Sequence, residues 1–177
     1  MNMGCRGYWA KVDDDVVLRP GAFDMMISAM AVAEEGGHQV GCCQMNVSDI
    51  KPTLLSIEHG QLKRCAGNRG ELAGDGWNAV VVDSVGTGST IFSSLPFSEG
   101  CRFEPSYVIG GVDVDMSWQM RQRDIGALLL ESDGNLHDLM RCTTAEYTMV
   151  RWNPKSINKS GDIFHRRWGI KDPHLKR

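Results

Sequence analysis

Four short apolar runs stand out in the second half of the chain, near residues 79–83, 107–114, 127–131 and 146–151. Continuous apolar runs of this length are typical of strands that are buried on both faces of a parallel sheet. The segment between the second and third runs has the pattern of a helix. Strands that alternate with crossover segments predict an α/β fold, with a mostly parallel sheet flanked by helices.

The first 76 residues are expected to contain two helices. Phe23, Met26, Ile27 and Met30 recur at the spacing of one helix face, and this face is expected to lie in the core. A second helix is predicted over about residues 51–65. We therefore divide the chain into an N-terminal helical extension, 1–76, and a core, 77–177, within one compact domain.

The composition is that of an average globular protein, with 42% hydrophobic and 23% charged residues, and excludes intrinsic disorder. No apolar run approaches the roughly 18 residues that span a bilayer, and the N-terminus lacks the order of a signal peptide. We therefore expect no membrane contact and a cytoplasmic location, or a nuclear one. The six cysteines form no C-x-x-C pair and the five histidines lie far apart, so reduced buried thiols are expected and a metal site is not.

The charge is distributed unevenly along the chain. Residues 1–140 hold 10 basic and 19 acidic side chains, a net charge of −9, whereas residues 141–177 hold 9 and 3, a net charge of +6. A basic tail that also contains tryptophans is suited to a phosphate backbone and to stacking on bases. The alternative is a solvated terminus that pairs with the acidic body of the same molecule.

Two segments have the pattern of a nucleotide-binding site. The predicted strand at 79–83 ends in Asp83 and leads into a Gly-Thr-Gly turn at 86–88. The two glycines of this turn have no Cβ atom, so the backbone can approach a ligand there. A second predicted strand ends in Asp113, whose two carboxylate oxygens suit a ribose diol, with Asp115 as a close competitor. The alternatives are a glycine-containing hairpin loop and an exposed acidic turn.

These segments resemble a known family. Val-Val-Val-Asp-x-x-Gly-Thr-Gly-Ser followed by Gly-Val-Asp-Val-Asp looks like the first two motifs of the class I, Rossmann-like methyltransferases that use S-adenosylmethionine. Asp133 occupies the place of the acidic residue at the tip of the third strand in that family. Residues 146–154, which end in Asn153-Pro154, are similar to the fourth strand of the amino-methylating branch, whose signature is Asn-Pro-Pro followed by Tyr or Phe. That branch includes the HemK-type glutamine methyltransferases and the adenine-N6 RNA methyltransferases.

The resemblance implies a Rossmann-like fold and methyl transfer from S-adenosylmethionine to an amino or amide nitrogen. Asn153 would accept hydrogen bonds from the target NH₂, and Pro154 would fix the turn that holds it. The basic tail beside this centre favours RNA over protein as the substrate. The cofactor contacts implied by the resemblance come from Asp83, Gly86, Thr87, Gly88, Asp113 and Asp133.

The chain departs from this family at its C-terminal end. Lys155 and Ser156 stand where the signature has a second proline and an aromatic residue, and 23 residues follow Pro154, too few for the remaining strands. A sheet that lacks its last strands exposes an edge, which invites pairing with a second copy or with a partner chain. The alternative function is a non-catalytic binding or scaffold protein that retains a nucleotide-binding-like fold and binds nucleic acid through its tail.

Overall fold

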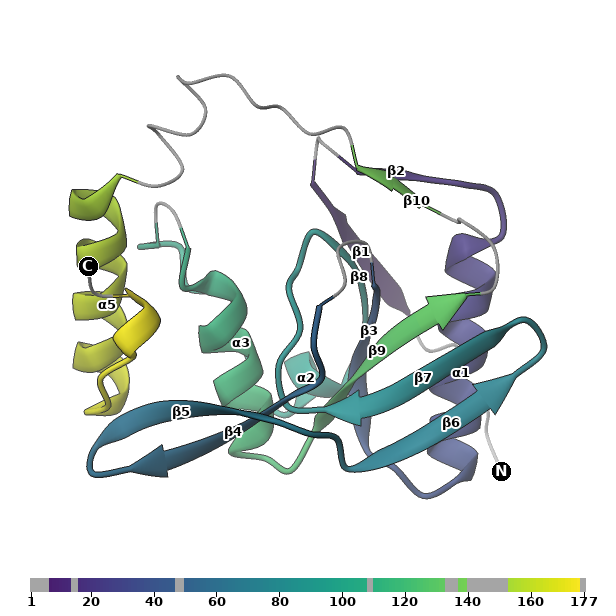
Figure 1. Cartoon of the computed structure of the whole chain (residues 1–177), viewed down its shortest axis with the longest axis horizontal. Helices are drawn as coiled ribbons and strands as arrows, with labels where there is room; N and C mark the ends of the chain where they lie inside the picture. Colours follow the sequence, from purple (N-terminus) through teal and green to yellow (C-terminus); the bar gives the residue numbers. More distant parts are fainter. Residues whose placement is uncertain are drawn as a thin grey trace.

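The computed structural model describes residues 7–13, 16–46, 50–107, 110–132, 137–139 and 153–175. Its centre is a six-stranded sheet with the order β1-β8-β3-β9-β7-β6, shown in Figure 1. The strands of this sheet are β1 (Tyr8–Val12), β3 (Val40–Met45), β6 (Gly70–Gly74), β7 (Trp77–Val82), β8 (Ser89–Ser93) and β9 (Gly126–Ser132). Two strand pairs stand apart from it, β2 (Val16–Leu18) with β10 (His137–Leu139), and β4 (Thr53–Glu58) with β5 (Gln61–Ala66). The helices are α1 (Ala22–Glu35), α2 (Leu95–Ser98), α3 (Val112–Arg121), α5 (Pro154–Trp168) and the short 3-10 helix η1 (Pro173–Leu175).

The prediction of a mostly parallel, Rossmann-like sheet is wrong. Among the described strands of the sheet, β3 and β9 form the one parallel pair, and the other neighbours run antiparallel. The β6–β7 connection gives the physical reason, because a two-residue turn at Asp75 and Gly76 can join only antiparallel strands. The apolar runs have the pattern of strands buried on both faces because hydrophobic layers cover both sides of the sheet. Such burial does not depend on whether neighbouring strands run parallel or antiparallel.

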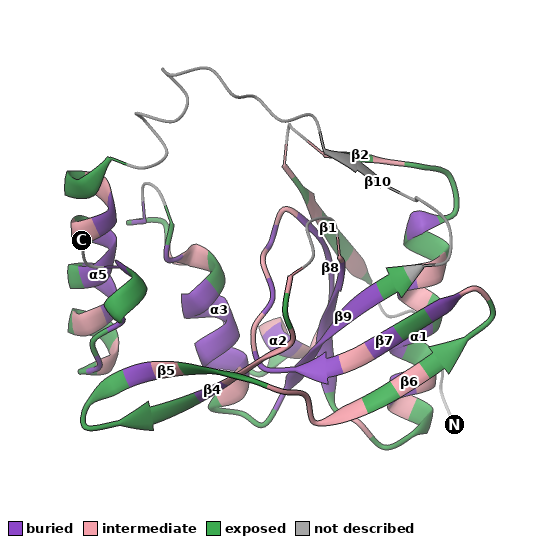
Figure 2. Cartoon of the chain, viewed as in Figure 1, coloured by how far each residue is buried: buried purple, intermediate pink, exposed green. Residues whose placement is uncertain are grey.

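Two hydrophobic layers enclose the central strands, which Figure 2 shows as mostly buried. On one face, Met26 and Met30 of α1 pack in the same cluster as Val81 and Leu128. The predicted helix is therefore confirmed as α1, although Phe23 is 41% exposed. On the other face, two methionines of α3 and the loop between β7 and β8 pack against β3, β8 and β9, and the buried members of this cluster include Cys42, Val85, Phe92, Met116, Met120 and Leu129.

The predicted helix over residues 51–65 is wrong, because this segment is the β4–β5 hairpin. His59 and Gly60 form its turn with φ values of 50° and 71°, which is the left-handed geometry that a two-residue hairpin turn requires. Gly60, a residue type that is unfavourable inside a helix, is thus a turn residue. The hairpin contributes Leu55 and Leu62 to a third hydrophobic cluster, which it shares with α3 and α5.

The predicted strand over 107–114 is also wrong, because α3 begins at Val112. Gly111 precedes the helix with φ 86°, and a Cβ there would lie 2.7 Å from the ring of Tyr107. The ring packs directly on the glycine, so the chain turns into a helix where the apolar pattern alone favours a strand. The predicted strands at 79–83 and 127–131 are confirmed as β7 and β9, and the one at 146–151 lies outside the described residues.

The C-terminal segment contains a helix that the sequence analysis did not predict. Helix α5 lies on the side of α3 that faces away from the central sheet, as Figure 1 shows. Ile163 and Phe164 pack with Val114 and Trp118 of α3. Within the described residues, no helix combines the length and the apolar character needed to cross a bilayer.

Candidate functional site

The Gly-Thr-Gly turn is held in place by side chains of the central sheet. Gly86 donates its backbone N–H to Oε1 of Gln44 at 2.7 Å, and Gln44 lies near the end of β3 with 2% of its surface exposed. Thr90 at the start of β8 donates its hydroxyl to the Gly86 carbonyl at 2.8 Å. Gln44, a polar side chain buried in the sheet, thus helps to fix the turn between β7 and β8.

The turn meets the first helical turn of α3. Thr87 donates its hydroxyl to Oδ1 of Asp113 at 2.6 Å, and Thr87 is buried whereas Asp113 is exposed. The two segments that the sequence analysis paired therefore do lie side by side. Asp113 comes from a helix, however, and not from the tip of a strand.

A second carboxylate lies on the other side of the same turn. Asp13, just after β1, donates its backbone N–H to the Gly88 carbonyl at 2.7 Å. A Cβ on Gly88 would stand 2.7 Å from Oδ2 of Asp13, so the glycine leaves room for this carboxylate. Lys11 donates from Nζ to Oδ1 of Asp13 at 2.5 Å and to the Thr87 carbonyl at 3.4 Å. We call Lys11, Asp13, Gln44, Thr87 and Asp113 the Thr87 site.

The sequence analysis missed Asp13. It opens a run of three consecutive aspartates, Asp13, Asp14 and Asp15, and the last two lie outside the described residues. An acidic run directly after a short strand was the available signal. It was counted in the net charge and not considered as a motif.

Asp83 is held elsewhere, in a buried ion cluster. It is 2% exposed, forms an ion pair with Arg69, and lies 3.3 Å from Nε of Arg121. Its Oδ2 also accepts the backbone N–H of Leu55 at 2.8 Å. These contacts tie α3, β4 and the residue before β6 to the end of β7, and they occupy the carboxylate that was predicted to bind a cofactor.

Asn153 and Pro154 start a helix. The Asn153 side chain accepts the backbone N–H of Lys155 at 3.0 Å, which is the hydrogen bond of an N-cap, and Pro154 is the first residue of α5. This capping accounts for both residues without a bound substrate. Asp133, the remaining predicted cofactor contact, lies outside the described residues.

A second carboxylate of α3 lies in a separate buried cluster. Asp115 is 1% exposed and accepts hydrogen bonds from Trp168 Nε1 at 2.7 Å and from Gln119 Nε2 at 2.8 Å. Burial raises the pKa of Asp115, and the neighbouring donors oppose that rise. Arg167 pairs with Asp115 at 3.2 Å and with Glu104, so at this residue the basic tail does pair with acidic groups of the same molecule.

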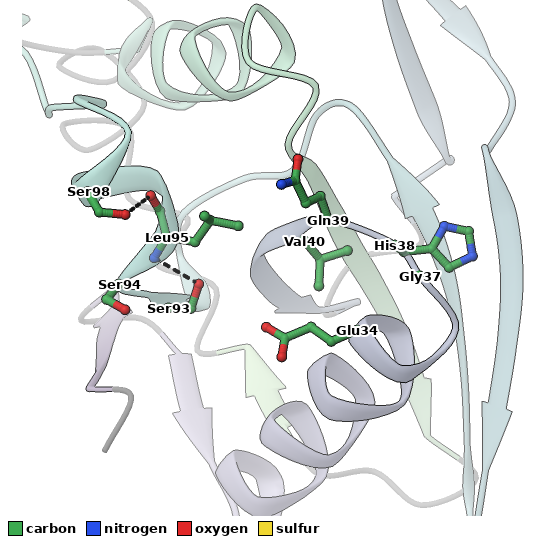
Figure 3. Close-up of a pocket in the computed structure, with 9 residues that line it drawn as sticks. All are labelled: Glu34, Gly37, His38, Gln39, Val40, Ser93, Ser94, Leu95 and Ser98. Atoms are coloured by element: carbon green, nitrogen blue, oxygen red, sulfur yellow. Dashed lines mark hydrogen bonds between the residues drawn. The ribbon is translucent and has the colours of Figure 1, made fainter. Parts of the chain in front are cut away.

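A pocket lies at the opposite end of the sheet from the Thr87 site. Its volume is about 380 Å³, and Figure 3 shows that its lining comes from the end of α1, the start of β3, the end of β8 and α2. The lining is largely polar and includes Glu34, His38, Gln39, Ser93, Ser94 and Ser98. The described residues that were predicted as site residues are absent from it.

The described part of the chain offers no ready-made metal cage, and Cys42 and Cys43 are poor candidates for a reactive thiol. It contains no group of three or more His, Cys, Asp or Glu side chains that could hold a metal ion. Burial raises the pKa of Cys42 and of Cys43, which keeps both thiols protonated at neutral pH. In comparisons with known proteins, no family model and no curated protein matches the chain.

Proposed function

We propose that the Thr87 site belongs to a transferase that uses a nucleoside-diphosphate-activated donor and a divalent cation, and that glycosyl transfer to a hydroxyl group is its reaction. The proposal rests on one observation, which is that two carboxylates contact successive residues of the same turn, Thr87 and Gly88. Asp13 packs against Gly88, and Asp113 accepts the hydroxyl of Thr87. Of the two carboxylates at this turn, one can bind a cation and the other can accept a proton.

Asp13 is the cation ligand in this proposal. Mg²⁺ and similar hard cations prefer oxygen ligands and are commonly held by one or two carboxylates plus phosphate oxygens of the substrate. A site with few protein ligands is therefore consistent with a cation that arrives together with a diphosphate. Lys11, which pairs with Asp13 at 2.5 Å, is placed to contact the same phosphates once the cation replaces it on the carboxylate.

Asp113 is the general base. It takes the proton from the acceptor hydroxyl, and the acceptor oxygen forms a bond to the donor carbon. The bond from that carbon to the diphosphate oxygen breaks, and its electron pair stays on the diphosphate, whose charge a cation held by Asp13 would neutralise. Asp113 is exposed and lies in the first turn of α3.

Two other chemistries have less support from the geometry. A phosphate cradle at a helix N-terminus needs a glycine turn that leads into a helix, whereas this turn leads into β8 and the Gly86 N–H is already bonded to Gln44. Covalent catalysis by Cys42 or Cys43 would need a thiolate, which burial disfavours.

The proposal is tested by turnover. The purified protein is incubated with Mn²⁺ and a panel of nucleoside-diphosphate sugars, and release of the nucleoside diphosphate is measured. Asp113→Asn should lower turnover by about 100-fold or more, the range of general-base catalysis. Asp24→Asn is the matched control, because Asp24 is an exposed aspartate in the first turn of α1. Equal turnover of wild type and Asp113→Asn would refute the role of Asp113.

Methyl transfer from S-adenosylmethionine is the second candidate. The Thr87–Asp113 hydrogen bond favours it, because the resemblance pairs these two segments around the cofactor. In this case binding of S-adenosylmethionine should be independent of divalent cations. Asp113→Ala should weaken it by about 1.5–3 kcal/mol, as expected for a hydrogen bond to a charged group. Calorimetry with the cofactor and with its demethylated product, in the presence of a chelator, separates the two candidates.

A further inference from the structure

The first turn of α3 carries two aspartates that face different parts of the molecule. Asp113 contacts the Gly-Thr-Gly turn, whereas Asp115 is buried against the end of α5. Any motion that shifts one of these residues moves the other, because they are two residues apart in one helical turn. The buried aspartate is thus coupled mechanically to the exposed one.

The N-terminus of α3 has little local support of its own. Gly111 precedes the helix in a left-handed conformation and provides no side-chain cap. The helix is 10 residues long, and helices of that length depend on tertiary contacts for their stability. Tertiary contacts must therefore fix the direction of its first turn, and the groups packed around Asp115 are among them.

Two of those groups come from the last turn of α5, and together with two others they surround the carboxylate with donors. Trp168 donates from Nε1 at 2.7 Å and Arg167 lies 3.2 Å away through Nε, both at Oδ1. Tyr107 adds a longer hydroxyl contact of 3.4 Å. The other oxygen, Oδ2, accepts the Gln119 amide. Removing one donor from such a site leaves a buried charge incompletely paired.

We infer that Asp115, Arg167 and Trp168 form a latch that docks α5 on α3 and thereby holds Asp113 against Thr87. These three are positioning residues, since none of them contacts the Thr87 site in the described contacts. The docking part of this inference stands on its own, and the consequence for ligand binding rests on the proposed function. An intact last turn of α5 is then a condition for a correctly oriented Asp113.

The latch is tested first without any ligand, by amide hydrogen exchange on the full chain. Trp168→Phe keeps the aromatic packing and removes the N–H donor. Exchange should rise about tenfold or more at the start of α3 and in residues 84–90, as expected for the loss of a hydrogen bond to a charged group. Ile163→Val is the matched control, because Ile163 lies in the α5 cluster but makes no polar contact with Asp115. The rise in hydrogen exchange caused by Ile163→Val should be confined to α5.

A change that is confined to α5 in Trp168→Phe would overturn the latch. If this variant does not fold, Asp115→Asn and Tyr107→Phe replace it, with a larger effect expected for Asp115→Asn because the Tyr107 contact is long. The second readout is the affinity for Mn²⁺ with a nucleoside diphosphate, which should fall in the latch variants and not in Ile163→Val. Equal affinities in wild type and latch variants would overturn the coupling. A wild-type protein that binds no nucleotide, but shows the exchange effect, would refute the proposed function and leave the latch in place.

Discussion

Asp113 and Asp115 share one helical turn but belong to two different kinds of region. The Thr87 site holds Asp113 at the surface with Thr87 as its described hydrogen-bond donor, and Asp13 beside the same turn is also partly exposed. The cluster around Asp115 is buried and supplies donors to both carboxylate oxygens. A carboxylate that is surrounded by protein donors stabilises the fold, whereas an exposed carboxylate can also be reached by a ligand.

The largest expected effect follows from removing the buried carboxylate. Asp115→Ala leaves the Trp168 N–H, the Gln119 amide and Arg167 without their acceptor, so the free energy of unfolding should fall by about 3–5 kcal/mol. Asp113→Ala should cost less than about 1 kcal/mol, because a surface carboxylate is solvated when its partner is lost. Urea denaturation of both variants measures the difference. Equal losses of stability would remove the distinction between the two regions.

Gly88→Ala tests whether the surface region depends on the place of the Asp13 carboxylate. The added Cβ would lie 2.7 Å from Oδ2 of Asp13 and must displace that flexible side chain. Affinity for Mn²⁺ with a nucleoside diphosphate should fall at least about tenfold, equivalent to about 1.4 kcal/mol. The melting temperature should change little, and unchanged affinity would show that Asp13 is not a ligand.

Much of the sheet could be predicted from the sequence, and its pairing could not. The apolar runs at 79–83 and 127–131 are β7 and β9, because burial on two faces leaves a clear mark in a single sequence. Strand direction depends on the connections, and no strand was predicted at 70–74, where a two-residue turn joins β6 to β7 as an antiparallel pair. The start of α3 was missed because the backbone leaves the extended conformation at Gly111, with φ 86°, and the apolar pattern of this segment does not show that change.

The candidate site was predicted in part for a similar reason. The Gly-Thr-Gly turn does contact Asp113, through Thr87. These two residues are 26 positions apart in the sequence, and Asp113 lies in a helix. The ion pairs of Asp83 could not be predicted, because Arg69 and Arg121 lie in other parts of the chain. Local sequence does not show that a carboxylate is already neutralised.

Asn153→Ala tests whether Asn153 caps a helix or contacts the ligand. Loss of the N-cap hydrogen bond to Lys155 should lower the free energy of unfolding by about 1 kcal/mol. Binding of Mn²⁺ with a nucleoside diphosphate should be unchanged, since the capping hydrogen bond accounts for the placement of Asn153. Ligand affinity that falls while thermal stability does not would argue for a direct role of Asn153.

The pH dependence of stability gives the smallest expected effect. Burial raises the pKa of Asp115 above its ordinary value of 3.8, so the folded state binds this proton more tightly than the unfolded state. The stability of the wild type relative to Asp115→Asn should therefore be highest below pH 3.8 and should fall as the pH rises through the raised pKa. Urea titrations across this range measure the difference. A relative stability that rises with pH would mean that the donors around Asp115 outweigh its burial.

Calorimetric titration of the protein with a nucleoside diphosphate, with and without Mn²⁺, tests the central claim most directly. The wild type should bind only when the cation is present, because Asp13 contacts the diphosphate through it. Asp13→Asn should bind at least about tenfold more weakly, whereas Asp24→Asn should bind like the wild type. Binding that needs no cation, or that is equal in the wild type and Asp13→Asn, would contradict the assignment of this edge of the sheet as a cation-dependent nucleotide site.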